Sequence, residues 1–421
     1  MPGPPPTPVA RVGAAGVRAR AAVNRALALP AQLRERHPGI VATAGVFTAA
    51  LLAFIAIGAA LPVLPTFVRG PLHAGDVAVG VVVGAFALTA VVARPVAGRL
   101  ADRRGRRVVL VVGALVMALG GLIYVLSESV LELVLARLVV GAGEGAVYTA
   151  GAAWAVDLAP DDKHGLALGL FGLAVWGGLS LGPVTGELLR SAAGYDAVWV
   201  LTAALPLAGA AIAARLPEPR HAPGDQPVES LAWFPRAARR PGLALALANV
   251  GYAALAGFGV LLLRARGIGG GASIFTAFAI AVFVSRIVLN RMPDRAGAQT
   301  TATAAGLLEA LGLAIIAVAN SLPVALLGAI VVGAGFSMLF PSLALMVVGD
   351  VAEHRRASAL GAFTAFFDIG VGLGAPLAGA LAAASGYTSV FVVAAVAALF
   401  SAALAATRRT APRPRRAPQS A

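Results

Sequence analysis

Six ionisable side chains stand inside long apolar stretches of this sequence, where a charge is costly and is usually kept for a function. They are Arg94, Arg137, Glu144, Arg286, Glu309 and Asp368. All five histidines lie in tails or in connections between the apolar stretches, so a proton site within the stretches must be a carboxylate. Carboxyl groups in a low-dielectric medium can load and release protons near neutral pH. These residue types therefore indicate proton binding.

Glu144 is the first candidate for the proton site. It lies near the middle of the apolar stretch 130–156, with Arg137 seven residues earlier and Tyr148 four residues later. On a helix these three side chains form one polar stripe. The alternative is a static ion pair between Glu144 and Arg137.

Asp368, in the segment FFDIG, is the second candidate, and its alternative is a hydrogen bond that holds helix packing. For Glu309 we expect a structural or interfacial role at the periphery. Arg94 and Arg286 stand near the ends of their apolar stretches. We expect them to snorkel or to brace the neighbouring connections rather than to touch a ligand.

The stretches that hold these residues are typical of membrane helices. The chain of 421 residues is 59% hydrophobic and only 12% charged, whereas soluble domains are about a quarter charged. Apolar runs of about 20 residues, long enough to cross a bilayer, recur without strict alternation and therefore predict helices. The twelve predicted spans are 44–67, 76–97, 107–127, 130–156, 164–189, 195–215, 241–263, 271–290, 298–319, 321–349, 356–383 and 387–407.

The placement of basic residues predicts the orientation. With both termini in the cytoplasm, only four of the 33 lysines and arginines fall in outer connections, as the positive-inside rule requires. We therefore expect a multi-pass protein of the inner or plasma membrane. The basic tails 1–43 and 408–421 are expected to be disordered, and 216–240 is expected to form a cytoplasmic linker.

Composition and motifs exclude several other classes. The net charge of +14 does not indicate nucleic-acid binding, because the basic residues are scattered between apolar runs. Zero cysteines exclude disulfides and thiolate metal sites. No ATP-binding loop, HExxH motif or metal cluster occurs, so we expect no cofactor, no metal and no enzyme. A membrane-embedded enzyme and a non-transporting sensor or scaffold are the disfavoured alternatives.

A shift of 192 residues superimposes one half of the chain on the other. It places Arg94 on Arg286, Arg99 on Arg291, Asp102 on Asp294, Arg103 on Arg295 and Gly105 on Gly297. The shared offset predicts a duplication, with six-helix lobes at 44–215 and 241–407. Parallel repeats of this kind bind substrate at the midplane and rock to alternate access. The predicted fold class is an all-α membrane protein of twelve transmembrane helices in two pseudo-symmetric lobes.

The most charged segment of the chain is GRLADRRGRR, residues 98–107, in which six of ten residues are charged. Its arginines hold an inner connection in the cytoplasm, and its carboxylate can accept hydrogen bonds from them or from a helix N-terminus. Because the segment recurs in the second half, we expect an inner gate. The predicted gate residues are Gly98, Asp102, Arg103, Gly105, Arg106, Asp294 and Arg295.

This segment resembles the loop 2–3 signature of the major facilitator superfamily. Arg137 followed by Gly141 and Gly143 resembles the helix 4 motif of that superfamily, and LPVLP at 61–65 resembles the helix 1 ending of its drug exporters. The helix 5 motif of its proton-coupled exporters is matched by Gly169, Gly178, Gly182, Pro183 and Gly186. The sequence departs from that motif at Glu187, where a second glycine is usual. The resemblance covers residues 44–407.

The resemblance implies positions for these residues. Asp102 and its arginines would pair with the start of helix 11 when the cavity faces outward, and the helix 5 run would form a close-packed seam between the lobes. Helices 1, 4, 7 and 10 would line the cavity. The expected cavity residues are then Arg137, Tyr148, Asn249, Tyr252, Phe336 and Phe340, with ordinary core packing as the alternative.

The predicted function is secondary transport: proton-coupled export of a small amphipathic or drug-like molecule by alternating access. The alternative is proton-driven uptake of a small metabolite such as a sugar or an organic anion. A mostly apolar cavity suits an amphipathic or cationic molecule, whereas Arg137 favours an anion, and the sequence leaves both open. The expected partners are the substrate, protons and the lipid bilayer, and we expect a monomer.

Overall fold

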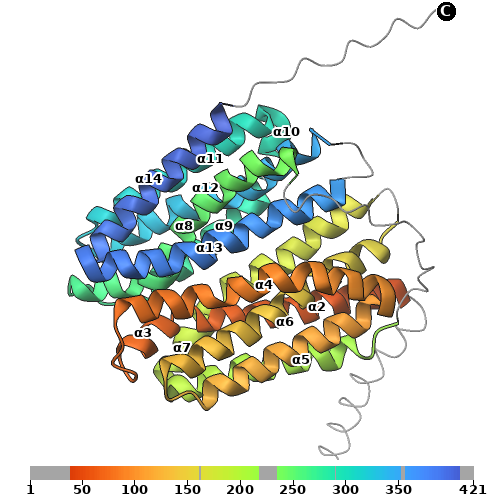
Figure 1. Ribbon diagram of the computed structural model, residues 1–421, viewed down its shortest axis with the longest axis horizontal. Coiled ribbons are helices and arrows are strands. Elements are labelled where there is room, and N and C mark those ends of the chain that lie inside the picture. The colour runs from red at the N-terminus through yellow and green to blue at the C-terminus, as the bar shows by residue number, and fades with distance from the viewer. Residues whose placement is uncertain (1–37, 161–162, 218–234, 290, 352–355, 408–421) are drawn as a thin grey trace, which may run out of the picture.

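Long helices that run side by side make up the described part of the chain (Figure 1). The computed structural model describes residues 38–160, 163–217, 235–289, 291–351 and 356–407, and these ranges contain helices, turns and no strand. The predicted all-helical membrane fold is confirmed. The predicted tails and most of the predicted linker lie outside the described residues.

The first half of the described chain contains six helices. They are α2 (Pro38–Ala60), α3 (Leu64–Arg69), α4 (Asp76–Arg104), α5 (Arg106–Val125), α6 (Val130–Asp157) and α7 (His164–Ala213). A capping box begins α6, where the Ser129 side chain accepts from the Glu132 N–H and the Glu132 carboxylate accepts from the Ser129 N–H. Helix α7 holds two predicted spans, 164–189 and 195–215, joined at Gly194.

The second half contains seven helices. They are α8 (Arg236–Ala265), α9 (Ser273–Val288), α10 (Met292–Ala296), α11 (Ala298–Val318), α12 (Leu322–Val348), α13 (Arg356–Ser385) and α14 (Tyr387–Ala406). The left-handed backbone needed for the sharp turn between α4 and α5 occurs at Gly105, with φ 96°, and recurs at Gly297, with φ 86°. Gly194 and Gly386, with φ 82° and 79°, form a second pair. Both pairs obey the 192-residue offset, so the two halves share their turns as well as their motifs.

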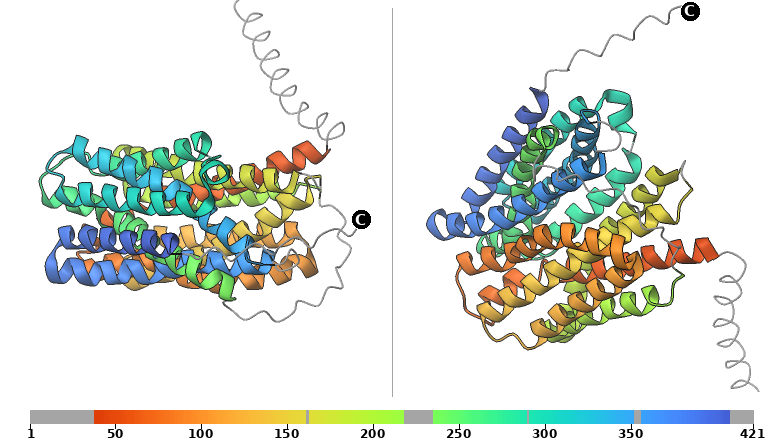
Figure 2. Two further views of the ribbon diagram at one scale, coloured as in Figure 1. Left: turned by 90° about the horizontal axis from the view of Figure 1, so that it is seen from above. Right: turned by 45° about the vertical axis from the view of Figure 1, so that its right-hand side comes forward.

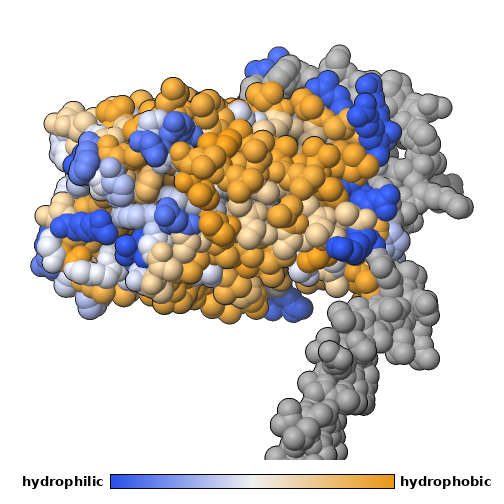
Figure 3. Space-filling view, turned by 90° about the horizontal axis from the view of Figure 1, so that it is seen from below, coloured by the Kyte–Doolittle hydropathy of each residue, from blue (hydrophilic) through white to orange (hydrophobic). Residues whose placement is uncertain are grey.

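The helices have the lengths and compositions that membrane crossing requires. Nine helical segments of the described chain qualify, with α7 counted once although it contains two predicted spans. Helix α9 is apolar but shorter, and α6 is the helix that carries Glu132, Arg137 and Glu144. Each predicted span coincides with a helix, while the count of twelve crossings stays a prediction. Apolar side chains cover the middle of the face in Figure 3, and hydrophilic ones gather towards its two ends.

The two halves pack tightly at one end of the molecule and spread apart at the other (Figures 1 and 2). At the end near α3, an added Cβ at Gly80 of α4 would lie 2.3 Å from the Ala375 carbonyl oxygen of α13. At the opposite end, an added Cβ at Gly169 or Gly361 would meet nothing within 4 Å. Under the predicted orientation the packed end is the outer one, so the halves are closed outside and apart inside.

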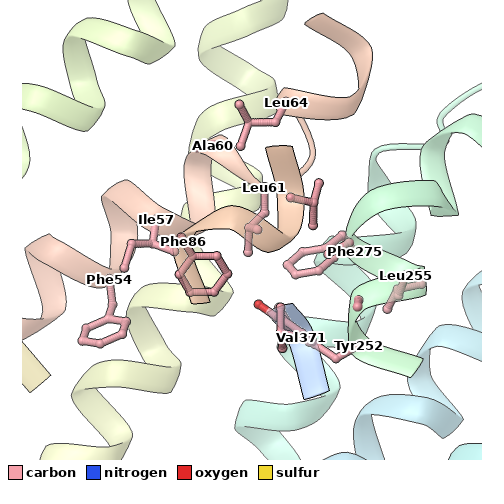
Figure 4. Close-up of a cluster of buried hydrophobic side chains, with 14 of the residues drawn as sticks. Phe54, Ile57, Ala60, Leu61, Leu64, Phe86, Tyr252, Leu255, Phe275 and Val371 are labelled. Atoms are coloured by element: carbon pink, nitrogen blue, oxygen red, sulfur yellow. The ribbon is translucent and has the colours of Figure 1, made fainter. Parts of the chain in front are cut away.

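A cluster of buried apolar side chains joins the halves (Figure 4). Leu61 and Phe86 belong to the first half, and Tyr252, Phe275 and Val371 to the second, yet all five lie in one cluster. Burial of apolar groups contributes about 25 cal/mol per Å² when water is the alternative, whereas in lipid close van der Waals packing holds helices together. The two halves therefore share one apolar core at this place.

Candidate functional site

A three-residue ionic cluster crosses the junction between the halves. The Arg94 Nε lies 2.8 Å from Asp368 Oδ2, and its Nη2 lies 3.2 Å from each carboxylate oxygen of Glu144. Arg94 comes from α4, Glu144 from α6 and Asp368 from α13. Their side chains are 14%, 6% and 1% exposed, respectively. The two candidate carboxylates, far apart in sequence, therefore share one arginine.

The expectation that Arg94 snorkels or braces an inner connection is wrong. The predicted span 76–97 placed Arg94 close to its inner end, but α4 continues to Arg104. Arg94 therefore lies in the interior of a long helix and faces the other half. Hydropathy does not predict this position, because the charge-rich segment 99–104 ends the apolar run before the helix ends at Arg104.

Tyr148 completes the cluster. The Arg94 guanidinium carbon lies 4.7 Å from the centroid of the Tyr148 ring, within the range of a cation–π contact. Tyr148 follows Glu144 by one helical turn, so both residues of the predicted polar stripe on α6 reach Arg94. Two of the three residues of the predicted stripe thus lie together, and the cation beside them is Arg94 of α4.

Arg137, the third member of the predicted stripe, is fully buried elsewhere. Its Nε and Nη2 donate to the carbonyl oxygens of Val82 and Val83, each at 3.0 Å, and its guanidinium lies over the Phe86 ring. The static Arg137–Glu144 pair is therefore not formed. The Arg137 Nη1 lies 3.5 Å from the Tyr124 hydroxyl of α5. Arg137 therefore fastens α6 to α4 and α5 inside the first half, and its three donor nitrogens all have partners there.

Aromatic rings adjoin the ionic cluster. Tyr252 of α8 stacks on Phe336 of α12 with ring centroids 5.5 Å apart. Trp176 of α7 meets the same Phe336 ring edge-on at 5.5 Å, and Phe367, next to Asp368 in the chain, lies 6.1 Å from Tyr252. Tyr252 and Phe336 were expected at the site. Trp176 and Phe367 were not, although Phe367 neighbours Asp368 and Trp176 lies within the helix 5 motif.

Two other predicted cavity residues lie away from this group. The Asn249 side chain is fully buried and donates to the Leu245 carbonyl oxygen at 2.8 Å, one turn back on α8. Phe340 packs on Phe363, with ring centroids 5.3 Å apart, beside a separate apolar cluster of the second half. Both residues therefore have the surroundings of ordinary core packing, which is the alternative to a place in the cavity.

Glu309 is enclosed rather than peripheral. Its side chain is fully buried, and neither carboxylate oxygen has a hydrogen-bond partner among the described residues. It faces α8 at Gly251, where an added Cβ would lie 2.7 Å from the Glu309 Oε1. The missing side chain at Gly251 makes the room that this carboxyl group occupies.

The predicted inner gate is tied to its own half. Asp102 is 63% exposed and accepts a hydrogen bond from Arg106, whose Nε also lies 3.0 Å from Asp157 Oδ2 of α6. Gly98 and Gly105 are half-buried, and Arg103, Asp294 and Arg295 are exposed. The predicted pairing of Asp102 with the start of helix 11 stays a prediction, because residues 352–355 lie outside the described part.

The helix 5 glycines pack within the first half, which corrects their predicted place between the lobes. Added Cβ atoms at Gly178, Gly182 and Gly186 would lie 2.7, 2.6 and 2.2 Å from backbone atoms of α2. Pro183 is buried beside them, whereas Gly169 is exposed near the start of α7. Small residues at a helix crossing let the backbones approach in lipid.

Other residues of α7 reach the second half. The Ser180 hydroxyl donates to the Ala279 carbonyl oxygen of α9 at 2.7 Å. One turn earlier, Trp176 contacts Phe336. The seam between the halves therefore exists on α7, but on the face opposite the glycines.

The described helices thus form two halves that meet at a buried ionic cluster. The family model of the Major Facilitator Superfamily matches residues 46–272 and again 267–421. The chain belongs to this superfamily. The two matches, one in each half, agree with the internal repeat.

Relatives and solved structures agree with this assignment. The chain is 32% identical over 383 residues to the uncharacterized MFS-type transporter STM4428 of Salmonella typhimurium, covering 88% of this chain and 97% of that one. It is 28% identical to the uncharacterized MFS-type transporter YhhS of Escherichia coli, covering 86% and 90%. These relatives are named as transporters, and the chain is an integral membrane protein.

Three solved transporters share the fold. The nucleoside transporter NupG matches with a TM-score of 0.71 at 16% identity, over 86% of this chain and 97% of that one. The human organic anion transporter MFSD10 matches with 0.67 at 19%, over 87% and 99%. A bacterial homolog of Spinster, in an inward-facing and unoccupied conformation, matches with 0.72 at 17%, over 88% and 96%. At these identities the likeness concerns the fold alone.

Proposed function

We propose that this protein is a secondary transporter that exports a small amphipathic molecule in exchange for protons, by alternating access. The observation that carries the proposal is the Arg94–Glu144–Asp368 cluster. It joins the two halves through buried charges at the place where a proton carrier must act. We further propose the cell membrane as its location, cytoplasmic termini, a monomer, and lobes at 44–215 and 241–407 joined by the linker 216–240.

Breaking this cluster requires a charge to change. Opening the outer side separates α4 from α13 and so separates Arg94 from Asp368. Removal of one partner of a buried ion pair costs about 3–5 kcal/mol, because a charge is left uncompensated. Separation leaves Asp368 unpaired, while Arg94 keeps Glu144 within the first half. Protonation of Asp368 removes its negative charge and lowers that cost. Proton binding therefore favours the separation of the halves, and by linkage the separation favours proton binding.

The closed outer side supports alternating access. The Tyr387 hydroxyl of α14 donates to Asp76 Oδ1 of α4 at 2.8 Å, and Arg69 Nε lies 3.5 Å from the same oxygen. The Tyr387–Asp76 contact joins the halves at the end opposite to the one where they spread apart, and Arg69 holds Asp76 within the first half. A transporter in this state receives its cargo and releases its protons on the inner side, which is the exchange required for export. The export direction itself rests on the resemblance of helix 5 to exporters.

The test is proton movement in proteoliposomes that carry a lumenal pH indicator and an imposed pH gradient. Panels of drug-like amines, organic acids, nucleosides and sugars are added to vesicles with the parent, Glu144→Gln or Asp368→Asn. Glu187→Gln is the control, since Glu187 pairs with Arg190 away from the cluster. We expect a compound that dissipates the gradient with the parent and control only. Equal proton flux with all four proteins would contradict the proposal. Inside-out and right-side-out vesicles separate export from uptake.

A further inference from the structure

Arg286 lies at the junction of the halves without a carboxylate partner. Its guanidinium carbon is 5.4 Å from the centroid of the Trp176 ring, which belongs to the other half. Its Nη2 donates to the Ser337 carbonyl oxygen at 3.0 Å. Its Nε is buried and has no hydrogen-bond partner within the described ranges. One buried donor of a half-buried cation is thus left free beside an aromatic ring.

The contrast with its repeat mate is informative. Arg94 binds two carboxylates, whereas the 192-residue offset places Phe336 where a second Glu144 would be. Among the described side chains Arg286 forms no ion pair. The second half thus has the arginine without the carboxylate that accompanies it in the first half.

A buried cation without a counter-ion is costly in a membrane. The carbonyl of Ser337 and the face of Trp176 offset part of this cost, but neither supplies a negative charge. A bound anion would supply it. Arg also binds carboxylate, sulfonate and phosphate groups through paired N–H donors.

The same charges disfavour a cationic cargo. Glu144 and Asp368 are the buried carboxylates of the junction, and both already contact Arg94. A cation would therefore meet an uncompensated Arg286 and two carboxylates that are already paired. An anion would meet a free donor at Arg286, with the Trp176 and Phe336 rings beside it to cover an apolar body.

We infer that the cargo is an amphipathic organic anion, whose acidic group binds Arg286 and whose apolar body lies against Trp176 and Phe336. This inference rests on the proposed transport function and names its substrate class. It resolves the choice between cation and anion that the sequence leaves open. The anion-binding residue is Arg286 and not Arg137, because the Nε and Nη2 of Arg137 already donate to backbone carbonyl oxygens.

The test measures binding to the full-length, detergent-solubilised protein by calorimetry at one pH and ionic strength. The probes are 1-naphthoate, its neutral counterpart 1-naphthamide, and the cation 1-naphthylmethylammonium. A charge-assisted hydrogen bond contributes about 1.5–3 kcal/mol, so we expect naphthoate to bind about ten-fold or more tightly than naphthamide. Arg286→Gln should abolish this preference, and Arg286→Lys should retain part of it. Arg264→Gln, at an exposed arginine of α8, should leave it unchanged.

Thermal unfolding and gel filtration of each variant establish that it is folded, and the lysine variant separates loss of charge from loss of packing. Tighter binding of the cation overturns the inference. Equal affinity for naphthoate and naphthamide also overturns the inference. The absence of measurable binding of both compounds at millimolar concentration overturns it too. A naphthoate preference that survives Arg286→Gln overturns it as well.

The proteoliposome assay separates this inference from the proposed function. If amines or neutral compounds move protons and naphthoate does not bind, transport stands and the anion site is wrong. If naphthoate binds through Arg286 but no compound moves protons, the anion site stands and proton-coupled transport is wrong.

Discussion

At the scale of single residues, the molecule separates three kinds of buried charge by their partners. Arg94 has two carboxylates, Arg286 has a carbonyl and an aromatic face, and Glu309 has no polar partner in the described part of the chain. Under the proposed function, the first arrangement responds to protons, because protonation of a carboxylate removes one partner of Arg94. The second is open to an added anion. For the third, Glu309, we expect neither effect and a cost in stability.

We predict that Glu309→Met stabilises the protein. A carboxyl group without a hydrogen bond costs free energy when buried, and an apolar side chain of similar volume does not. Thermal unfolding in detergent should show a melting temperature several degrees higher, while proton-coupled transport is retained. Glu128→Met, at an exposed carboxylate, is the control and should change little. A lower melting temperature together with lost transport would show that Glu309 has a functional partner.

At the scale of elements, α7 has two faces with separate tasks. Gly178, Gly182 and Gly186 pack closely against α2 within the first half. Trp176 and Ser180 contact the second half. The exporter-like motif is thus a packing device within one half, because only glycine lets the α2 and α7 backbones come this close. Glu187, which departs from the motif, instead pairs with Arg190 and does not disturb that packing.

We predict that Gly186→Val is strongly destabilising and that Gly169→Ala is not. A Cβ at Gly186 would lie 2.2 Å from the Ala59 carbonyl oxygen, whereas one at Gly169 meets nothing within 4 Å. Overpacking of this kind costs about 1–3 kcal/mol or more. Melting temperature and yield of monodisperse protein measure the difference. Equal stability of the two variants would contradict the prediction, because close contact between the α2 and α7 backbones leaves no room for a valine side chain at position 186.

At the scale of the whole molecule, the balance between states depends on contacts at its two ends. The end near α3, which is the outer end under the proposed orientation, is held by the contact of Tyr387 with Asp76 and by close packing of α4 on α13. The opposite ends of the halves have no comparable packing at Gly169 and Gly361. Weakening the outer contact should therefore shift the population towards the state that opens outside.

We predict that Tyr387→Phe populates the outward-open state. Loss of one hydrogen bond to a charged group changes the ratio of states by about ten-fold or more. The chain has no cysteine, so spin labels at Gly75→Cys and Ser385→Cys report the outer distance without background, and a longer-distance population should grow. Tyr195→Phe is the matched control, because the repeat mate Tyr195 bonds Thr66 within its own half. The same distances in both variants would contradict the prediction.

The sequence by itself determined the helices, the repeat and the candidate carboxylates. Apolar runs must become helices in lipid because no other local structure satisfies the backbone there, and Glu144 and Asp368 are conspicuous as charges within such runs. The turn glycines Gly105 and Gly297 were visible through the shared offset. These properties depend on local composition and on spacing along one chain.

Only the tertiary structure decided which groups face each other. Arg94 meets Asp368 across 274 positions of sequence, and Arg137, which shares a helix with Glu144, points elsewhere. The helix 5 glycines lie against α2. Arg286 faces Trp176, and its Nε has no hydrogen-bond partner among the described residues. Such pairings follow from the rotation, crossing and true length of packed helices, which hydropathy along one chain does not encode.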